Sequence, residues 1–86
     1  MEVEQARLAH ADATERLAVS ARAVEQAEES ASLSRARFEQ GALLSADLIG
    51  VETRRLEAIV RHASATADAH LALADLRRAL GLPLFE

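Results

Sequence analysis

The sequence predicts an all-α fold, a long antiparallel two-helix coiled-coil hairpin that self-associates into a helical bundle. Three observations carry this prediction. Residues 2–40 contain neither Gly nor Pro, apolar or small residues return every seven positions, and one short glycine turn divides the 86 residues into nearly equal halves. Half of the residues are hydrophobic, with alanine the commonest of them, and only two are aromatic. Alanine favours helix but contributes little to a core, so the composition indicates packing against partners.

The first helix is expected over about residues 2–40, where Ala, Glu, Arg and Leu dominate. A helix of this length is typical of a coiled coil. One heptad row consists of Leu17, Val24, Ala31 and Phe38, and the small residues of the interleaved row are Ala13, Ser20, Ala27 and Ser34.

The turn is expected over residues 41–44. Gly41 suits the position after a helix end, where a left-handed backbone is easiest without a Cβ. Ser45 is the expected N-cap of the second helix, with Asp47 in the first turn favoured by the helix dipole. A connection this short predicts antiparallel neighbours.

The second helix is expected over about residues 45–80, followed by a short tail that begins with Gly81 and contains Pro83. Gly50 lies inside this helix and costs about 1 kcal/mol relative to alanine. Two stripes run along it, and two stripes indicate contact with more than one neighbour. The first is Leu44, Val51, Ala58, Ala65, Ala72 and Ala79, and the second is Ile59, Thr66, Leu73 and Leu80. Ion pairs at helical spacing are expected between Asp12 and Arg16, Arg35 and Glu39, and Glu57 and Arg61.

Composition excludes several classes of function. The net charge of −4 leaves no basic surface for nucleic acid. Cysteine is absent, which excludes disulfides and thiol chemistry. No stretch approaches the roughly 20 apolar residues of a membrane span, and the N-terminus has no signal-peptide pattern, so the segment itself is expected to be soluble.

No catalytic, metal or cofactor site is expected. The three histidines, His10, His62 and His70, lack a partner at a metal-binding spacing and are interpreted as lying on or beside a seam. No nucleophile elbow, phosphate-binding loop or carboxylate dyad is present. The segment is therefore not expected to be an enzyme.

The order of motifs along the chain resembles a known family. The first helix ends in Arg37-Phe38-Glu39-Gln40-Gly41, the second begins with Ser45-Ala46-Asp47-Leu48-Ile49, and the last motif is Leu76-Arg77-Arg78-Ala79-Leu80-Gly81. This order and spacing resemble the outer membrane efflux proteins of the TolC family, in particular the periplasmic helical hairpin of their C-terminal repeat. The resemblance covers nearly the whole chain.

The resemblance implies a passive conduit for efflux or type I secretion. The parent protein would be a trimer in the outer membrane with a periplasmic helical tunnel, served by a periplasmic adaptor and an inner-membrane pump. Phe38, Gly41, Ala42 and Leu43 would form the tip where the adaptor docks. Asp47 would lie at the tunnel constriction, where three copies would form a ring that attracts cations. Phe38 stands where the family usually has tyrosine, and Gly50 where some members have a second aspartate.

The strands and other helices of that family are absent from these 86 residues, so the chain (1–86) is expected to be an excised hairpin fragment. The alternative is a stand-alone coiled-coil interaction module, although the seams carry Ala and Ser where such modules usually carry Leu and Ile. A small helical enzyme resembling chorismate mutase is a third option, but the chain has no lysine for an acidic substrate.

Overall fold

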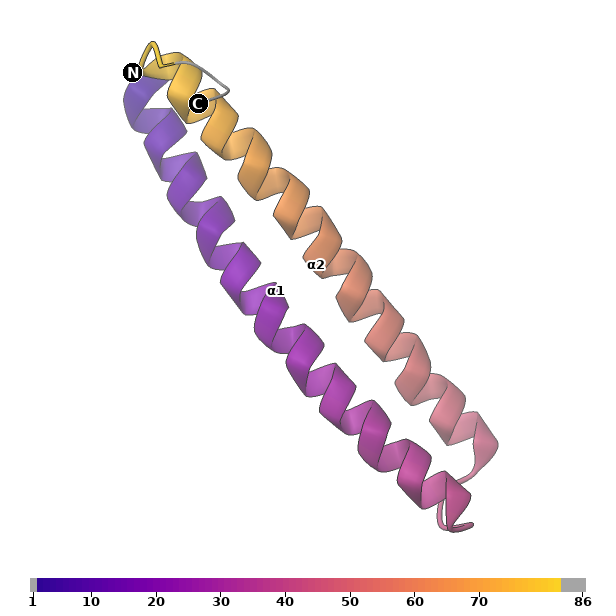
Figure 1. Cartoon of the computed structure of the whole chain (residues 1–86). Coiled ribbons are helices and arrows are strands. Elements are labelled where there is room, and N and C mark those ends of the chain that lie inside the picture. Colours follow the sequence, from indigo (N-terminus) through magenta and orange to yellow (C-terminus); the bar gives the residue numbers. More distant parts are fainter. Residues whose placement is uncertain (1, 83–86) are drawn as a thin grey trace.

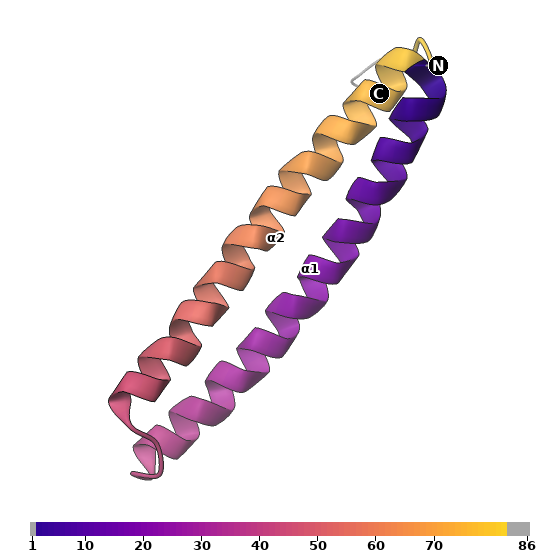
Figure 2. The ribbon, with the colours of Figure 1, turned by 180° about the vertical axis from the view of Figure 1, so that it is seen from behind.

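A computed structural model describes residues 2–82 and confirms the helical hairpin. Helix α1 spans Glu2–Glu39 and helix α2 spans Ser45–Ala79. They run antiparallel, so the first and last described residues lie together at one end and the turn at the other (Figure 1). The same arrangement is seen from behind in Figure 2. The molecule measures 60 × 23 × 15 Å, and no strand occurs among residues 2–82.

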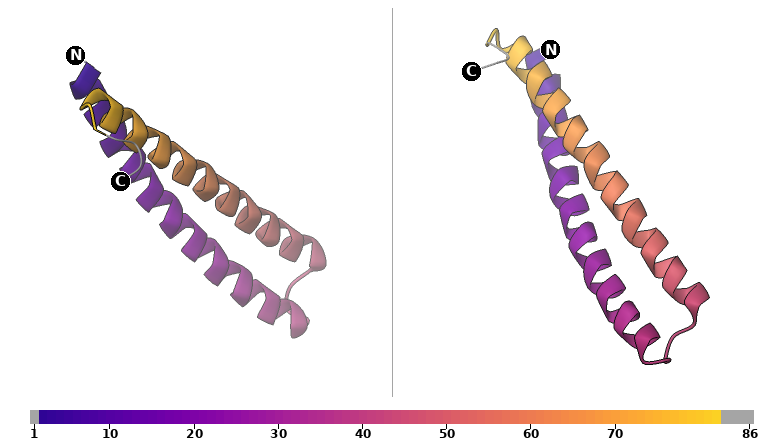
Figure 3. Two further views of the ribbon diagram at one scale, coloured as in Figure 1. Left: turned by 45° about the horizontal axis from the view of Figure 1, so that its top comes forward. Right: turned by 45° about the vertical axis from the view of Figure 1, so that its right-hand side comes forward.

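The two helices meet along one continuous heptad seam and cross at a shallow angle (Figure 3). Every seam residue is buried or half-buried, at alternating spacings of three and four. On α1 the seam consists of Val3, Ala6, His10, Ala13, Leu17, Ser20, Val24, Ala27, Ala31 and Ser34. On α2 it consists of Leu48, Val51, Arg55, Ala58, His62, Ala65, Ala69, Ala72, Leu76 and Ala79.

Within the described part of the chain, the only buried residues are four alanines of this seam. Ala31 and Ala13 are 0% and 2% exposed, and Ala58 and Ala65 are 7% and 9% exposed. Small side chains let the two backbones approach closely, but they remove little apolar surface from water. The core of the hairpin therefore contributes little stabilising free energy.

Two residues of the predicted heptad rows lie outside the seam. Phe38 lies one heptad beyond Ala31 but is 41% exposed, because the seam loses its partner where α1 ends. Leu44 is 73% exposed because it precedes α2. In the second predicted stripe Ile59 and Thr66 are half-buried at the edge of the seam, whereas Leu73 and Leu80 are 38% and 47% exposed.

Gly41 ends α1 in the predicted left-handed conformation, with a φ of 74°. The Gly41 amide donates to the Phe38 carbonyl at 2.9 Å, and the Ala42 amide donates to the Arg37 carbonyl at 2.8 Å. This pair of bonds is a Schellman motif. The same motif ends α2 at Gly81, with a φ of 76°.

Replacing Gly41 by alanine is expected to lower the free energy of unfolding by about 1 kcal/mol, since a Cβ disfavours the left-handed backbone. Nothing lies within 4 Å of the added Cβ, so a steric clash makes no contribution. Thermal unfolding followed by circular dichroism checks this, with Ala42→Gly as the comparison. An unchanged midpoint for Gly41→Ala would contradict the assignment.

The start of α2 differs from the prediction. Leu44, not Ser45, is the N-cap, with φ −74° and ψ 148°, and no side chain caps the helix. The amides of Asp47 and Leu48 both donate to the Leu44 carbonyl at 3.1 Å. Ser45 is thus the first helical residue, and its hydroxyl is not positioned as a cap.

Gly50 offers a stabilising substitution. Its backbone is helical, and an added Cβ would meet only the end of the Arg54 side chain at 3.7 Å, an ordinary contact. We expect Gly50→Ala to raise the free energy of unfolding by about 0.5–1 kcal/mol, through helix propensity and reduced freedom of the unfolded chain. A lower melting temperature would show that Gly50 is required by local packing.

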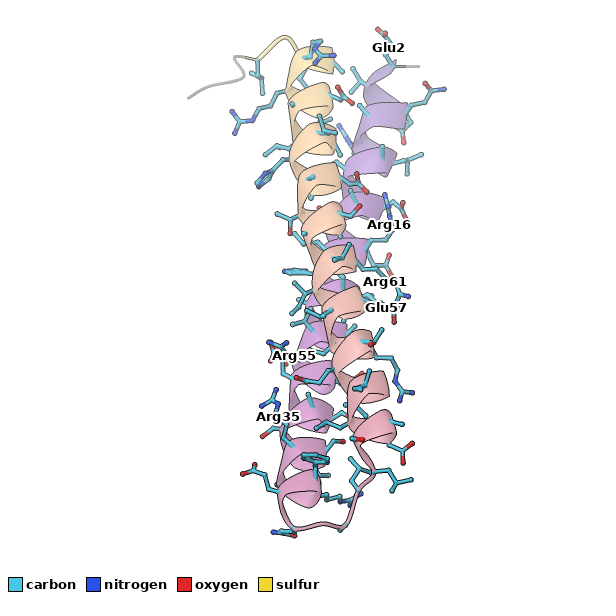
Figure 4. All side chains as sticks on the ribbon, turned by 90° about the vertical axis from the view of Figure 1, so that its right-hand side faces the viewer. Glu2, Arg16, Arg35, Arg55, Glu57 and Arg61 are labelled. Atoms are coloured by element: carbon cyan, nitrogen blue, oxygen red, sulfur yellow. The ribbon has the colours of Figure 1, made fainter. Side chains whose placement is uncertain are left out.

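Ion pairs flank the seam on both long edges (Figure 4). Arg35 pairs with Glu52 at 3.4 Å and Arg55 with Glu28 at 3.0 Å, along one edge. Arg16 lies on the other edge, between Asp12 at 3.1 Å and Asp68 at 3.6 Å. The Asp12–Arg16 pair was predicted. The predicted Arg35–Glu39 and Glu57–Arg61 pairs do not form within residues 2–82, and Arg35 bonds across to the other helix instead.

Candidate functional site

The tip residues predicted from the sequence come together at one end of the hairpin. Phe38 occupies the last turn of α1 and is 41% exposed. Gly41 and Ala42 are exposed in the connection, and Leu43 is half-buried there. The two Schellman bonds at Gly41 fix the backbone, so this end presents a defined apolar surface of Phe38, Ala42 and Leu43.

Asp47 lies at the same end, in the first turn of α2. It is exposed, and its carboxylate forms no ion pair or side-chain hydrogen bond with any residue between 2 and 82. The positive end of the α2 dipole favours a negative charge at this position. Asp47 is therefore an accessible anion beside the tip, although no contact joins it to Phe38.

A polar pair lies midway along the seam, where the sequence predicted only that histidines lie on or beside it. The Ser20 Oγ is 3.0 Å from the His62 Nδ1 and donates to the Leu17 carbonyl at 2.9 Å. A hydroxyl has one proton to donate, so these two bonds together require Nδ1–H to donate to Ser20. The pair breaks the apolar pattern at one level, and a polar level in a coiled coil sets the register of the helices.

Arg55 is the second seam residue that the sequence did not reveal. Its Nε donates to Glu28 Oε2 at 3.0 Å, and this hydrogen bond and the charge of Glu28 raise the pKa of Arg55. The guanidinium is therefore charged at every pH at which the protein is folded. The signal was the spacing of Arg55 and His62: they lie seven residues apart, Arg55 between Val51 and Ala58 of the predicted stripe and His62 between Ala58 and Ala65.

Open grooves follow one long edge of the hairpin. One of about 570 Å³ is lined by residues including Ala23, Ala27 and Arg54, and another of about 410 Å³ by residues including Val19 and Ala58. Over residues 2–82 no group of three metal-ligating side chains gathers, and no polar side-chain atom is buried without a hydrogen-bond partner. The grooves suit the packing of another helix better than the enclosure of a small molecule.

Neither helix, over the described residues, has a stretch long and apolar enough to cross a membrane. Comparison with models of known protein families, with curated proteins and with solved structures gave no match.

Proposed function

We propose that the chain is a periplasmic helical hairpin of a TolC-like outer-membrane channel, a wall element of a passive conduit for efflux or type I secretion. The observation that carries the proposal is the tip. A turn held by two backbone hydrogen bonds at Gly41 ends a hairpin 60 Å long, with exposed Phe38 before the turn, exposed Ala42 within it and exposed Asp47 just after it. This is the order of groups that the resemblance assigns to adaptor docking and to the tunnel constriction.

The surface of the hairpin supports a role as a wall element. Twelve large apolar side chains are exposed over residues 2–82, while only alanines are buried. Helices that pack on one seam and leave other apolar rows uncovered are suited to neighbours on more than one side. In the proposed tunnel those neighbours are further hairpins of the same trimer.

The reading frame on either side of the 86 codons tests the proposal at once. We expect a similar hairpin upstream, alternating segments with strand periodicity, and a signal peptide at the true start. A stop codon directly upstream of Met1 would contradict the proposal.

Asp47 gives a functional test in the complete channel. Replacing it by asparagine is expected to lower cation-over-anion selectivity in single-channel recordings, because three carboxylates would leave the constriction. Asp75→Asn, the same change of charge at the other end of α2, is the matched control. Equal selectivity for Asp47→Asn and the unaltered channel would remove Asp47 from the constriction.

The second candidate function, a stand-alone interaction module, is favoured by the continuity of the seam. It runs without a break from Val3 to Ser34 on α1 and from Leu48 to Ala79 on α2. The contacts along this seam fix the alignment of the two helices without help from another chain. Self-contained folding without flanking segments in the gene would favour this function.

A further inference from the structure

Helix α2 carries a second row of residues that faces away from α1. We define the outer row of α2 as Thr53, Glu57, Val60, Ser64, Ala67, Leu71, Ala74 and Arg78, at alternating spacings of four and three. Val60 and Leu71 are 67% and 65% exposed, and among α2 residues these are two of the most exposed large hydrophobic side chains. The spacing is that of a coiled-coil seam. The outer row therefore has the pattern of an interface, without a partner in the chain.

A charged column lies beside the outer row. It consists of Arg54, Arg61, Asp68 and Asp75, each seven residues from the next and hence on one side of the helix. Its first two members are cations and its last two are anions. Arg54 and Arg61 form no ion pair with residues 2–82. Asp68 and Asp75 have only exposed partners, Arg16 at 3.6 Å and Arg78 at 3.3 Å.

We propose that a second copy of this chain packs antiparallel on the outer row of α2, about a twofold axis between Ser64 and Ala67. Reversal of the second helix brings Arg61 opposite Asp68 of the second copy and Arg54 opposite its Asp75, and the symmetry doubles each pair. In a parallel arrangement the two charged columns would lie on opposite sides of the interface, so the charges of one column would not meet those of the other. Charge complementarity thus selects both the occupant and its direction.

The shape of the row agrees with the same arrangement. A shallow hollow of about 360 Å³ is lined by Thr53, Leu56, Glu57, Val60 and Arg61. In the antiparallel pair, Leu71 of the second copy lies opposite Val60 and enters this hollow. At the axis, Ser64 and Ala67 face each other and are small enough for the backbones to approach. A coiled-coil seam packs in this way: large side chains enter hollows of the other helix, and small side chains meet at the centre.

The contact area sets the strength of the dimer. The outer row is about 38 Å long and a helix about 10 Å wide, so the two copies together bury roughly 800 Å². Stable protein interfaces begin near about 1,200 Å². We therefore expect a reversible dimer, present at about 100 μM and largely dissociated near 1 μM. The proposal concerns the 86-residue chain and does not rest on the proposed function, so either can fail alone.

Charge variants test the arrangement by sedimentation velocity at about 100 μM and low salt. Arg54→Asp/Arg61→Asp makes the column wholly acidic, and Asp68→Arg/Asp75→Arg makes it wholly basic. We expect each variant alone to sediment as a 9.3 kDa monomer and an equimolar mixture to recover the dimer. Arg7→Asp/Arg22→Asp, the same change on exposed positions of α1, is the matched control and should dimerise as the unaltered chain does.

Circular dichroism of each variant shows whether the hairpin is still folded. Folded variants that dimerise alone, or that stay monomeric when mixed, would overturn the proposal, as would an unaltered chain that is monomeric at about 100 μM. A distance measurement between two copies tests whether they pack antiparallel or parallel. A single spin label at Ser45→Cys, in a chain without cysteine, should give an intermolecular distance of about 60 Å. A distance below about 20 Å would indicate parallel packing and overturn the proposal.

Discussion

Replacing Ala31 by leucine is expected to lower the free energy of unfolding of the hairpin by about 1–3 kcal/mol, because the seam has no room for a larger side chain. Ala31 is 0% exposed, so protein atoms already surround its side chain. A leucine there must push the helices apart or adopt a strained rotamer. The seam contacts on either side would weaken together, since the hairpin has only small side chains with which to fill the space.

Ala18→Leu is the matched control. Ala18 is an exposed residue of α1, so the same change should alter stability by less than about 0.5 kcal/mol. Urea unfolding of both variants at one protein concentration gives the comparison. A stability for Ala31→Leu equal to that of Ala18→Leu would show that the seam is not closely packed at this level.

The second large effect is expected from the polar pair of Ser20 and His62. Ser20→Ala removes the acceptor for the half-buried Nδ1–H of His62 and should cost about 1 kcal/mol. The double variant Ser20→Ala/His62→Leu removes both polar groups and adds apolar area, so we expect it to be about 1 kcal/mol more stable than the unaltered chain. The two variants thus differ by about 2 kcal/mol.

The single variant His62→Leu completes a double-mutant cycle, because Ser20 keeps its bond to the Leu17 carbonyl when His62 is removed. A coupling energy near zero would mean that the Ser20–His62 bond does not contribute to stability. Although the double variant is expected to be more stable, we expect its two helices to align in more than one register, because the polar pair no longer selects one. Cross-linking of cysteine pairs placed along the two helices should detect more than one alignment in it.

The hairpin and the ends of its two helices were predictable because they depend on local properties of the sequence. Gly41 and Gly81 were predicted to end the helices, and both adopt the left-handed backbone with Schellman bonds. Leu17, Val24 and Ala31 were predicted in the seam and are buried or half-buried there. Helix propensity, glycine turns and a heptad period are properties of neighbouring residues, so one sequence is sufficient to reveal them.

The errors arose where partners on the other helix decide the outcome. Arg35 was expected to pair with Glu39 at helical spacing, but Glu52 across the seam lies within 3.4 Å. Arg55 and His62 occupy seam positions because Glu28 and Ser20 provide their hydrogen bonds. Phe38 continues the heptad in sequence but has no helix opposite it. Spacing within one helix can place Arg55 and His62 in the seam, but it does not show which residues of the other helix lie opposite.

The tip was predictable as a place and remains a proposal as a site. Gly41 fixes the turn, and the exposure of Phe38, Ala42 and Asp47 follows from their location at the end of the hairpin. An adaptor-docking surface and a constriction both require copies or partners that one chain does not contain. Their residues were therefore assigned from the resemblance alone.

The role of the hairpin as a tunnel wall is tested most directly by substitution into a channel. Residues 2–82 would replace the C-terminal-repeat hairpin of a TolC-family channel, in a strain without a channel of its own, and resistance to an exported toxic compound would be measured. The same chimera with Ala31→Leu, which disrupts the seam, is the control and should confer less resistance. We predict that the chimera assembles as a trimer and restores resistance to within several-fold of the unmodified channel. A chimera that assembles in the outer membrane as a trimer but confers no more resistance than a strain without a channel would contradict the role of the hairpin as a tunnel wall.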